Sequence, residues 1–382
     1  MIRNFLKISV SALVLCAAAG SAFAGGFSRG TADTDILFEK GNVAARMGVA
    51  VVAPTQDLII GAGLNIGSPL ETYYVPNFAA KFQLTDAAAC AATYTTPFGG
   101  DSDYRKTTLK VDPTSAIGSV SQNFSTNEFG ATCSYGFAVG PGKLHILGGV
   151  FYQTLDFKQD YGSTGPGVNP ALRLSLTDGG IGWRIGAAYE IPEIALRAQL
   201  MYRSGIDVTA TGTSDVLSSG TQIPGALGSG TFPQSFEMKL QSGVAEGWLV
   251  YGGVKWTDWS VFERLKYTAF SPVTGTNVNS ALNFFYRDGW TVNAGVAHRF
   301  NEQFAGTVNV TWDRGVSTGF DINSTTWTGA IGGSYTPNEK TEVRFGVAYT
   351  YIQDGVQLVP AGVKRADSGH ALAGSVSLGL KF

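Results

Sequence analysis

The sequence T-V-N-A-G-V-A-H-R-F at residues 291–300 alternates two kinds of side chain. Its even positions hold Val, Ala, Val, His and Phe, whereas its odd positions hold Thr, Asn, Gly, Ala and Arg. A period of two is typical of a β-strand whose two faces meet different surroundings. The same alternation recurs at residues 342–351 and at residues 372–382. These runs predict an all-β protein built from amphipathic strands.

Strand length and the rhythm of the connections distinguish a membrane barrel from a soluble β-sandwich, which also alternates. Several alternating runs are long enough for a tilted strand to cross a bilayer. The candidate strands cover residues 46–60, 73–84, 88–98, 122–139, 143–158, 178–191, 194–210, 231–244, 247–268, 283–300, 303–314, 324–336, 340–357 and 367–382. Tight connections, at residues 85–87, 140–142, near 192 and at 337–339, alternate with longer ones rich in Gly, Ser, Thr and Pro. We therefore predict a transmembrane antiparallel β-barrel of about 14 strands, with short periplasmic turns and long outer loops.

Composition narrows the class of partner. Gly accounts for 50 of the 382 residues, aromatic residues for 12% and charged residues for 15%. Frequent Gly and aromatic residues favour turns and strands and argue against disorder. The formal net charge of -2 excludes a basic nucleic-acid-binding protein, so we expect no nucleic-acid partner.

The first 24 residues have the pattern of a secretory signal peptide. Arg3 and Lys7 form a positive segment, residues 8–20 are mostly apolar, and Ala22-Phe23-Ala24 matches an A-x-A cleavage site. The alternative, a membrane-spanning helix, is disfavoured because the apolar run is short. We expect residues 1–24 to be removed and the mature chain to work outside the cytoplasm.

Tryptophans and the last residue fit a barrel in a membrane. Five tryptophans are expected near strand ends, as an aromatic girdle or alternatively as core residues: Trp248, Trp256, Trp259, Trp290 and Trp312. The chain ends in Phe382 on the apolar face of the last predicted strand. Barrel assembly machinery commonly reads such an ending, so we expect that machinery as a partner.

No residue set predicts catalysis or metal binding. Residues 26–30 match the string G-x-S-x-G, but no strand precedes them, as a nucleophile elbow requires. His145, His298 and His370 are far apart and lack the spacing of metal ligands. We expect no enzyme, no catalytic residue, no metal and no cofactor.

Cys90 and Cys133 lie on predicted neighbouring strands, on the faces that carry Tyr94 and Tyr135. An oxidising compartment permits a bond between such a pair. We predict a disulfide, and the alternative is two free buried thiols.

Several stretches resemble one known family of transporters. They are Val75-Pro76-Asn77-Phe78, Gly182-Trp183-Arg184-Ile185-Gly186, Phe232-Pro233-Gln234-Ser235, Trp256-Thr257-Asp258-Trp259-Ser260 and Tyr286-Arg287-Asp288. In their strand context they resemble the FadL family of long-chain fatty acid transporters, which also includes importers of aromatic hydrocarbons. The resemblance implies a monomeric barrel of fourteen strands in the outer membrane of a Gram-negative bacterium. It also implies an N-terminal plug and passive passage of hydrophobic molecules.

The resemblance divides the mature chain into a plug, residues 25–45, and a barrel, residues 46–382. This plug is shorter than the family's and lacks its N-P-A stretch, so its capacity to seal the barrel is in question. We expect Phe27 and Phe38 to point into the lumen and contact cargo.

The family has a side exit at a distortion of its third strand. In this chain the break at Pro97, Phe98, Gly99 and Gly100 is the candidate for that opening. The alternative is an ordinary strand end.

A hydrophobic cargo requires an apolar pocket, and a fatty acid also requires a cation for its carboxylate. Arg287 is the candidate, because its parity matches the polar face of Thr291 and Asn293 and the resembled family has a basic residue there. Further inward cations by parity are Arg184, Arg197, Arg203, Arg299 and Arg344, and their alternative role is a network on the lumen wall.

The predicted function is therefore passive uptake of hydrophobic molecules, most simply long-chain fatty acids, by a protein embedded in outer-membrane lipid. Two alternatives stay open. A general small-solute porin would have a wide polar lumen, and a structural or adhesive barrel would have no internal pocket.

Overall fold

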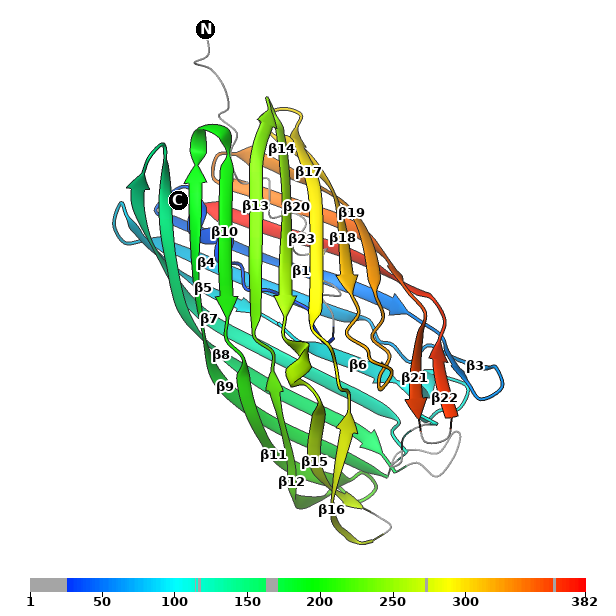
Figure 1. Ribbon diagram of the computed structural model, residues 1–382. Coiled ribbons are helices and arrows are strands. Elements are labelled where there is room, and N and C mark those ends of the chain that lie inside the picture. The colour runs from blue at the N-terminus through cyan, green and yellow to red at the C-terminus, as the bar shows by residue number, and fades with distance from the viewer. Residues whose placement is uncertain (1–25, 114, 116–117, 163–170, 272–273, 360–361) are drawn as a thin grey trace.

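Fourteen antiparallel strands close into a barrel in the computed structural model, which describes residues 26–113, 115, 118–162, 171–271, 274–359 and 362–382 (Figure 1). The wall strands are β1 (Val43–Thr55), β4 (Tyr73–Gln83), β5 (Ala88–Thr95), β7 (Ser121–Val139), β8 (Gly142–Tyr161), β9 (Leu172–Ile191), β10 (Leu196–Arg203), β13 (Ser235–Ala245), β14 (Trp248–Thr257), β17 (Gly289–Arg299), β18 (Phe304–Arg314), β19 (Thr326–Asn338), β20 (Thr341–Ile352) and β23 (Gly369–Lys381). β1 pairs with both β4 and β23, so the ring has no free edge. The predicted fold class is confirmed.

Short turns join the strands at the end where β1 begins. Gly140 and Gly247 adopt the left-handed conformation in two of these turns, which only glycine adopts at little cost. A short 3-10 helix, η4 (Pro192–Ile194), makes the predicted connection near residue 192. The alternation of short and long connections seen in the sequence therefore matches the two ends of the barrel.

The opposite end of the barrel carries the long connections, which form structure of their own. β2 (Leu58–Ile60), β3 (Leu64–Gly67), β21 (Gly355–Val359) and β22 (Gly362–Ala366) make a separate small sheet. β6 (Gly99–Asp103), β11 (Ile206–Val216), β12 (Thr221–Phe232), β15 (Arg264–Ser271) and β16 (Thr276–Asn283) extend the wall beyond the barrel (Figure 1). Two predicted strands, at 194–210 and 247–268, were therefore too long, because each joins a wall strand to part of this extension.

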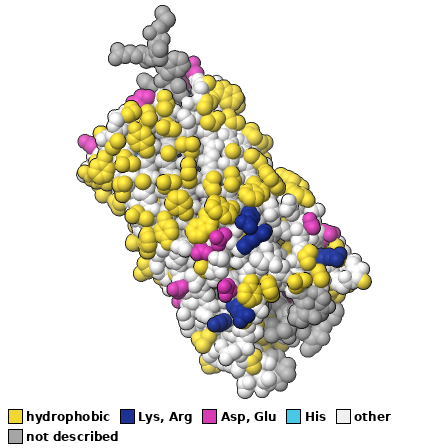
Figure 2. Space-filling view, viewed as in Figure 1, with side chains coloured by type: hydrophobic (Ala, Val, Ile, Leu, Met, Phe, Trp, Pro, Cys, Tyr) yellow, Lys and Arg dark blue, Asp and Glu magenta, His cyan; other side chains and the backbone are white. Residues whose placement is uncertain are grey.

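Each wall strand turns its apolar face outward. On β20, Phe345, Val347 and Tyr349 are exposed, whereas Arg344 before them and Thr350 after them are buried toward the lumen. Figure 2 shows hydrophobic side chains covering the barrel half of the molecule on the face in view. Such a band is the surface that a barrel presents to lipid. Within the described residues no helix is long and apolar enough to span a bilayer.

Tryptophans occupy two different environments. Trp248 and Trp290 are exposed on the outward face, as a girdle requires. Trp259 is only 1% exposed, so its predicted place in the girdle is wrong. It belongs to a short helix, η5 (Trp259–Val261), which interrupts the strand alternation and turns the indole into the lumen.

Candidate functional site

The N-terminal segment, residues 26–42, lies inside the barrel. Its helix η2 (Thr34–Phe38) buries Ile36 and Leu37 against small residues of the wall and against Leu147. β1 begins at Val43, three residues before the predicted start of the barrel. The segment is therefore a short plug that the wall surrounds.

Acidic residues hold the lower part of the plug, where β1 begins and β23 ends. Asp33 and Glu39 both pair with Arg46 of β1, and Glu39 also lies 2.9 Å from Lys381 Nζ. Asp35 Oδ2 lies 3.2 Å from Lys239 Nζ. Burial alone would raise the pKa of Asp35 and Glu39, but the surrounding cations outweigh it and lower each pKa to about 2.

The inward arginines that parity predicts form a network on the lumen wall. Arg184 and Arg203 both bind the buried carboxylate of Glu128, and Arg203 also contacts Gln153 at 2.6 Å. Arg197 lies 4.6 Å from the ring centroid of Phe38. Arg184 and Arg203 are therefore engaged by the protein itself, which is the alternative role that the sequence left open.

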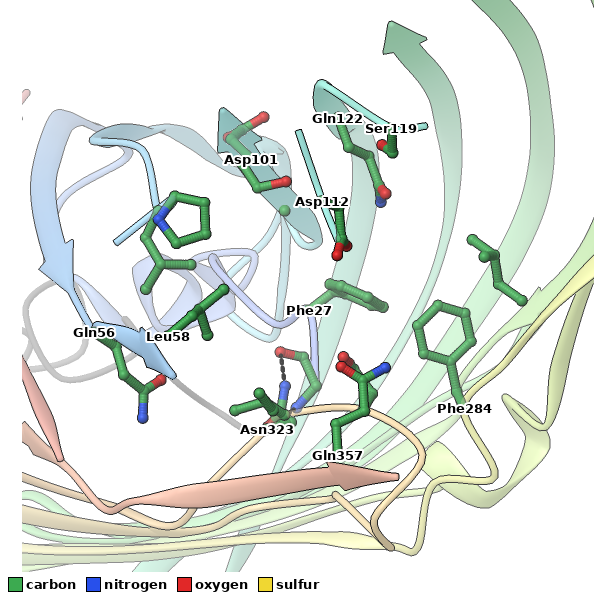
Figure 3. Close-up of a pocket in the computed structure, with 18 of the residues that line it drawn as sticks. Phe27, Gln56, Leu58, Asp101, Asp112, Ser119, Gln122, Phe284, Asn323 and Gln357 are labelled. Atoms are coloured by element: carbon green, nitrogen blue, oxygen red, sulfur yellow. Dashed lines mark hydrogen bonds between the residues drawn. The ribbon is translucent and has the colours of Figure 1, made fainter. Parts of the chain in front are cut away.

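Aromatic residues hold the upper part of the plug. Phe27 packs edge-on against Phe124, Trp259, Phe262 and Phe284, with ring centroids 5.5–6.1 Å apart. Such edge-to-face contacts add to the free energy of burying the rings. The N–H of Gly26 donates to Asn323, whose amide donates back to the Gly26 carbonyl (Figure 3).

A cavity of about 550 Å³ lies above Phe27, between the plug and the outer loops. Figure 3 shows Phe27, Phe284 and Leu58 on its walls together with Asp101 and Asp112. The volume suits one drug-sized molecule. Phe27, predicted to face cargo, thus lines the cavity.

The charged residues that line this cavity are mostly acidic. Among the described lining residues the acids are Glu71, Asp101, Asp112, Asp313 and Asp321, and the cations are Arg29 and Lys364. Arg29 pairs with Asp101 at 2.6 Å, and Lys364 lies 3.5 Å from Asp112. Burial raises the pKa of Asp321, which accepts a hydrogen bond from Tyr286. Within the described residues, both cations that line the cavity therefore have an acidic partner.

The wall is interrupted at residues 96–98, between β5 and β6. β7 pairs with β5 up to Glu128 and with β6 up to Ser125, and between them the Thr126 hydroxyl bonds the backbone of Phe98. The break pairs with the plug instead: Arg29 N–H donates to the Pro97 carbonyl, and Gly99 N–H donates to the Phe27 carbonyl.

The neighbouring strand lacks a partner at the same level. β4 pairs with β5 only from Asn77 to Gln83, so residues 73–76 have no strand on that side in the described structure. Pro97, Phe98, Gly99 and Gly100, predicted as a side opening, therefore lie at a discontinuity of the wall that the plug covers.

Arg29 covers this discontinuity. Its guanidinium lies 3.9 Å from the ring centroid of Tyr73 on β4 and pairs with Asp101 on β6. A Cβ on Gly99 would lie 2.7 Å from the guanidinium carbon, so only glycine leaves room for it. The sequence analysis missed Arg29 and Asp101, although an arginine inside a predicted plug was a usable signal.

A second cavity of about 270 Å³ lies on the other side of the plug. Phe38 lines it, with its ring edge-on to His145 at 5.3 Å. His145 in turn lies 3.4 Å from Glu190. The plug thus separates two cavities, and the two predicted cargo contacts, Phe27 and Phe38, lie on different ones.

Arg287 lies outside both cavities, so its expected inward orientation is wrong. Its side chain is exposed, and its Nε donates to the Gly315 carbonyl at 3.0 Å. β17 begins only at Gly289, so the strand alternation does not reach Arg287. Tyr286, the preceding residue, turns inward instead and joins the aromatic cluster around Phe27.

Cys90 and Cys133 face each other directly across β5 and β7, and the structure joins them in a disulfide. Both strands belong to the wall, so the bond ties neighbouring strands and does not contact either cavity.

Comparison with known proteins agrees with this architecture. A family model described as outer membrane protein transport protein (OMPP1/FadL/TodX) matches residues 33–315. The long-chain fatty acid transport protein of Escherichia coli (strain K12) is 26% identical over 222 residues, which cover 51% of this chain and 48% of the relative. The chain thus spans about half the length of that relative. The Salmonella typhi protein of the same name is 23% identical over 318 residues, which cover 74% of this chain and 71% of that relative.

Solved structures share the fold at low sequence identity. The crystal structure of a Pseudomonas aeruginosa FadL homologue has a TM-score of 0.73 at 13% identity, and covers 97% of this chain and 98% of its own. The P. putida toluene transporter TodX has a TM-score of 0.64 at 15% identity, with 91% and 92% covered.

Proposed function

Because this chain belongs to the OMPP1/FadL/TodX family of outer-membrane transport proteins, we propose that it carries hydrophobic small molecules passively across the outer membrane. The family is one of transport proteins rather than enzymes, as the sequence analysis expected. The plug and the aromatic residues that line the cavity support a transporter over a general porin, since an open aqueous pore offers an apolar molecule no gain in free energy.

The cargo that fits the outer cavity best is an uncharged hydrophobic molecule. The charge balance of the lining carries this proposal: five acids against two cations, each cation paired with an acid. A carboxylate placed there would be desolvated beside other carboxylates, which is costly. Relatives include both a long-chain fatty acid transport protein and a toluene transporter, so both kinds of cargo occur in proteins of this fold. We favour an aromatic or other uncharged hydrocarbon over a free long-chain fatty acid.

The route that we propose leaves the cavity sideways. The wall discontinuity at residues 96–98 adjoins the cavity, and Arg29 closes it through Tyr73 and Asp101. An apolar cargo that leaves by this gap enters the hydrocarbon of the bilayer without crossing water. Movement of the plug would withdraw Arg29 and open the gap.

Two ligands of equal chain length test the cargo class. The purified barrel should bind methyl oleate more tightly than oleate at neutral pH. Asp112→Asn leaves Lys364 without its acid and should strengthen oleate binding by roughly tenfold, the effect of one charge-assisted hydrogen bond. Methyl oleate binding should barely change. The matched control is Asp156→Asn, a half-exposed acid of β8 that does not line the cavity.

Wild-type protein that binds oleate more tightly than methyl oleate would overturn the uncharged cargo and restore the fatty acid. Failure to bind either ligand, with a heat-modifiable barrel still folded, would count against hydrophobic transport itself.

A further inference from the structure

Arg314 ends β18 on the outward face of the barrel. Val308 and Val310 are exposed on this strand, whereas Thr307, Asn309 and Asp313 alternate with them and are buried. Because side chains of a strand alternate between faces, Arg314 shares the face of the exposed valines. Its backbone partner on β17 is Trp290, which is also exposed.

Arg287 is anchored beside this position. Its N–H donates to the Val316 carbonyl and its Nε to the Gly315 carbonyl, each at 3.0 Å. The exposed guanidinium is therefore held against Gly315, the residue that follows Arg314 at the end of β18. Burial and the neighbouring charge of Arg314 lower the pKa of Arg287.

Within the described part of the chain neither arginine forms an ion pair, whereas Arg105 and Arg173 each pair with an aspartate. Asp288, the acid next to Arg287, instead accepts a hydrogen bond from the Trp256 indole at 3.0 Å. Two close cations repel each other, and an anion between them removes that cost. The pair thus lacks the counter-charge that most other arginines of this structure have.

The pair lies at the outer edge of the lipid-facing surface. Trp290 of β17 is 39% exposed and Trp327 of β19, which pairs with the other edge of β18, is 49% exposed, as expected of residues at the level of lipid head groups. Figure 2 shows basic side chains gathered at this boundary of the hydrophobic band, over the outer ends of β17 and β18. An anion that reaches the pair is therefore one carried by the membrane.

We propose that Arg287 and Arg314 together bind a phosphate group of an outer-leaflet lipid. Two guanidinium groups can each bind a phosphate through paired N–H donors, which a single lysine cannot do. In a Gram-negative outer membrane the phosphorylated lipid of that leaflet is lipid A. This site is independent of the cargo, because neither arginine lines a cavity.

Lipid retention tests the site. The full barrel is purified in detergent, exposed to bisphosphorylated lipid A or to its dephosphorylated form, and analysed by native mass spectrometry. The wild type should retain the bisphosphorylated lipid at least tenfold more than the dephosphorylated one. The double variant Arg287→Ala/Arg314→Ala should lose this preference, whereas Arg287→Lys/Arg314→Lys should keep part of it.

Lys158→Ala is the matched control, since Lys158 is an exposed cation of β8 that already pairs with Asp156. Folding of every variant is checked by heat-modifiable migration. Equal retention of lipid A by the wild type and the double alanine variant would overturn the proposal. So would displacement of lipid A by millimolar inorganic phosphate, which would indicate a site for free anions.

Discussion

The two halves of the plug are held to the same barrel by different forces. Below, Asp33, Asp35 and Glu39 pair with cations of the wall. Above, Phe27 is held by aromatic contacts, and an ion pair joins Arg29 to Asp101. A buried ion pair is costly to separate, because removal of one partner leaves the other as an unpaired buried charge. Aromatic contacts, in contrast, can be replaced by contacts with an apolar ligand. We therefore expect the lower half to anchor the plug and the upper half to be the part that an apolar ligand displaces.

Removal of the whole plug should have the largest effect on conductance through the barrel. Deletion of residues 26–42 takes away both sets of contacts and should open a conducting path through a barrel that stays heat-modifiable. Planar-bilayer conductance measures the result. Unchanged conductance would mean that the outer loops seal the lumen and that neither half of the plug does.

Loss of the anchor alone comes next. Arg46→Met leaves Asp33 and Glu39 without their shared partner and should destabilise the seated plug by about 3–5 kcal/mol. Protease access to the segment and conductance both report it. Lys106→Met breaks an exposed pair with Glu71 and should cost at most about 1 kcal/mol. Equal effects of the two substitutions would show that the buried ion pairs of Arg46 hold the plug no more strongly than an exposed pair does.

Acidification should act on the anchor before it acts on the aromatic contacts. The pKa of Asp35 falls from 3.8 to about 2, and that of Glu39 from 4.5 to about 2. A depressed carboxyl pKa stabilises the seated plug above the ordinary pKa, and this stability is lost as pH falls toward the depressed value. Conductance should therefore stay low from pH 8 to 5 and rise between about pH 4 and 2. A rise already near pH 6 would point to another group.

The smallest expected change is in the upper half. Gly99→Ala places a methyl group where the Arg29 guanidinium lies and should cost about 1–3 kcal/mol by overpacking, displacing Arg29 from the wall gap. Transfer of an uncharged hydrocarbon into proteoliposomes should become faster, with conductance unchanged. Gly148→Ala, at a wall glycine with open space around its Cβ position, is the control. Identical transfer by both variants would exclude Arg29 as the closing residue.

Wall strands were predictable because alternation is a local property of the chain. Successive side chains of residues 342–351 point to opposite faces, and this does not depend on which strands pair with them. Arg344 was therefore correctly predicted to face the lumen from its position in the alternation alone. Prediction failed where the chain leaves the wall. Arg287 precedes the first residue of β17, so parity placed its side chain on the wrong side. Trp259 was expected at a strand end but lies in a short helix, which turns it inward.

The plug was predicted as a segment but not as a set of contacts. That Phe27 and Phe38 lie inside the barrel followed from the resemblance and their apolar character. That Arg29 reaches Asp101 and Tyr73 did not, because these partners are 72 and 44 residues away and meet only when the wall closes.

Sequence by itself determined the barrel, because a period of two, long strands and alternating connection lengths are all properties of neighbouring residues. Only the tertiary structure decided which charges meet. Closure of the ring brings β1 against β23 and encloses the plug, so acids and cations from distant segments become partners within one low-dielectric space. The same closure pairs both cations of the outer cavity with acids and leaves Arg287 exposed beside Arg314 at the end of β18. The sequence gives the number of charged residues, but which of them remain available to a ligand depends on which strands become neighbours.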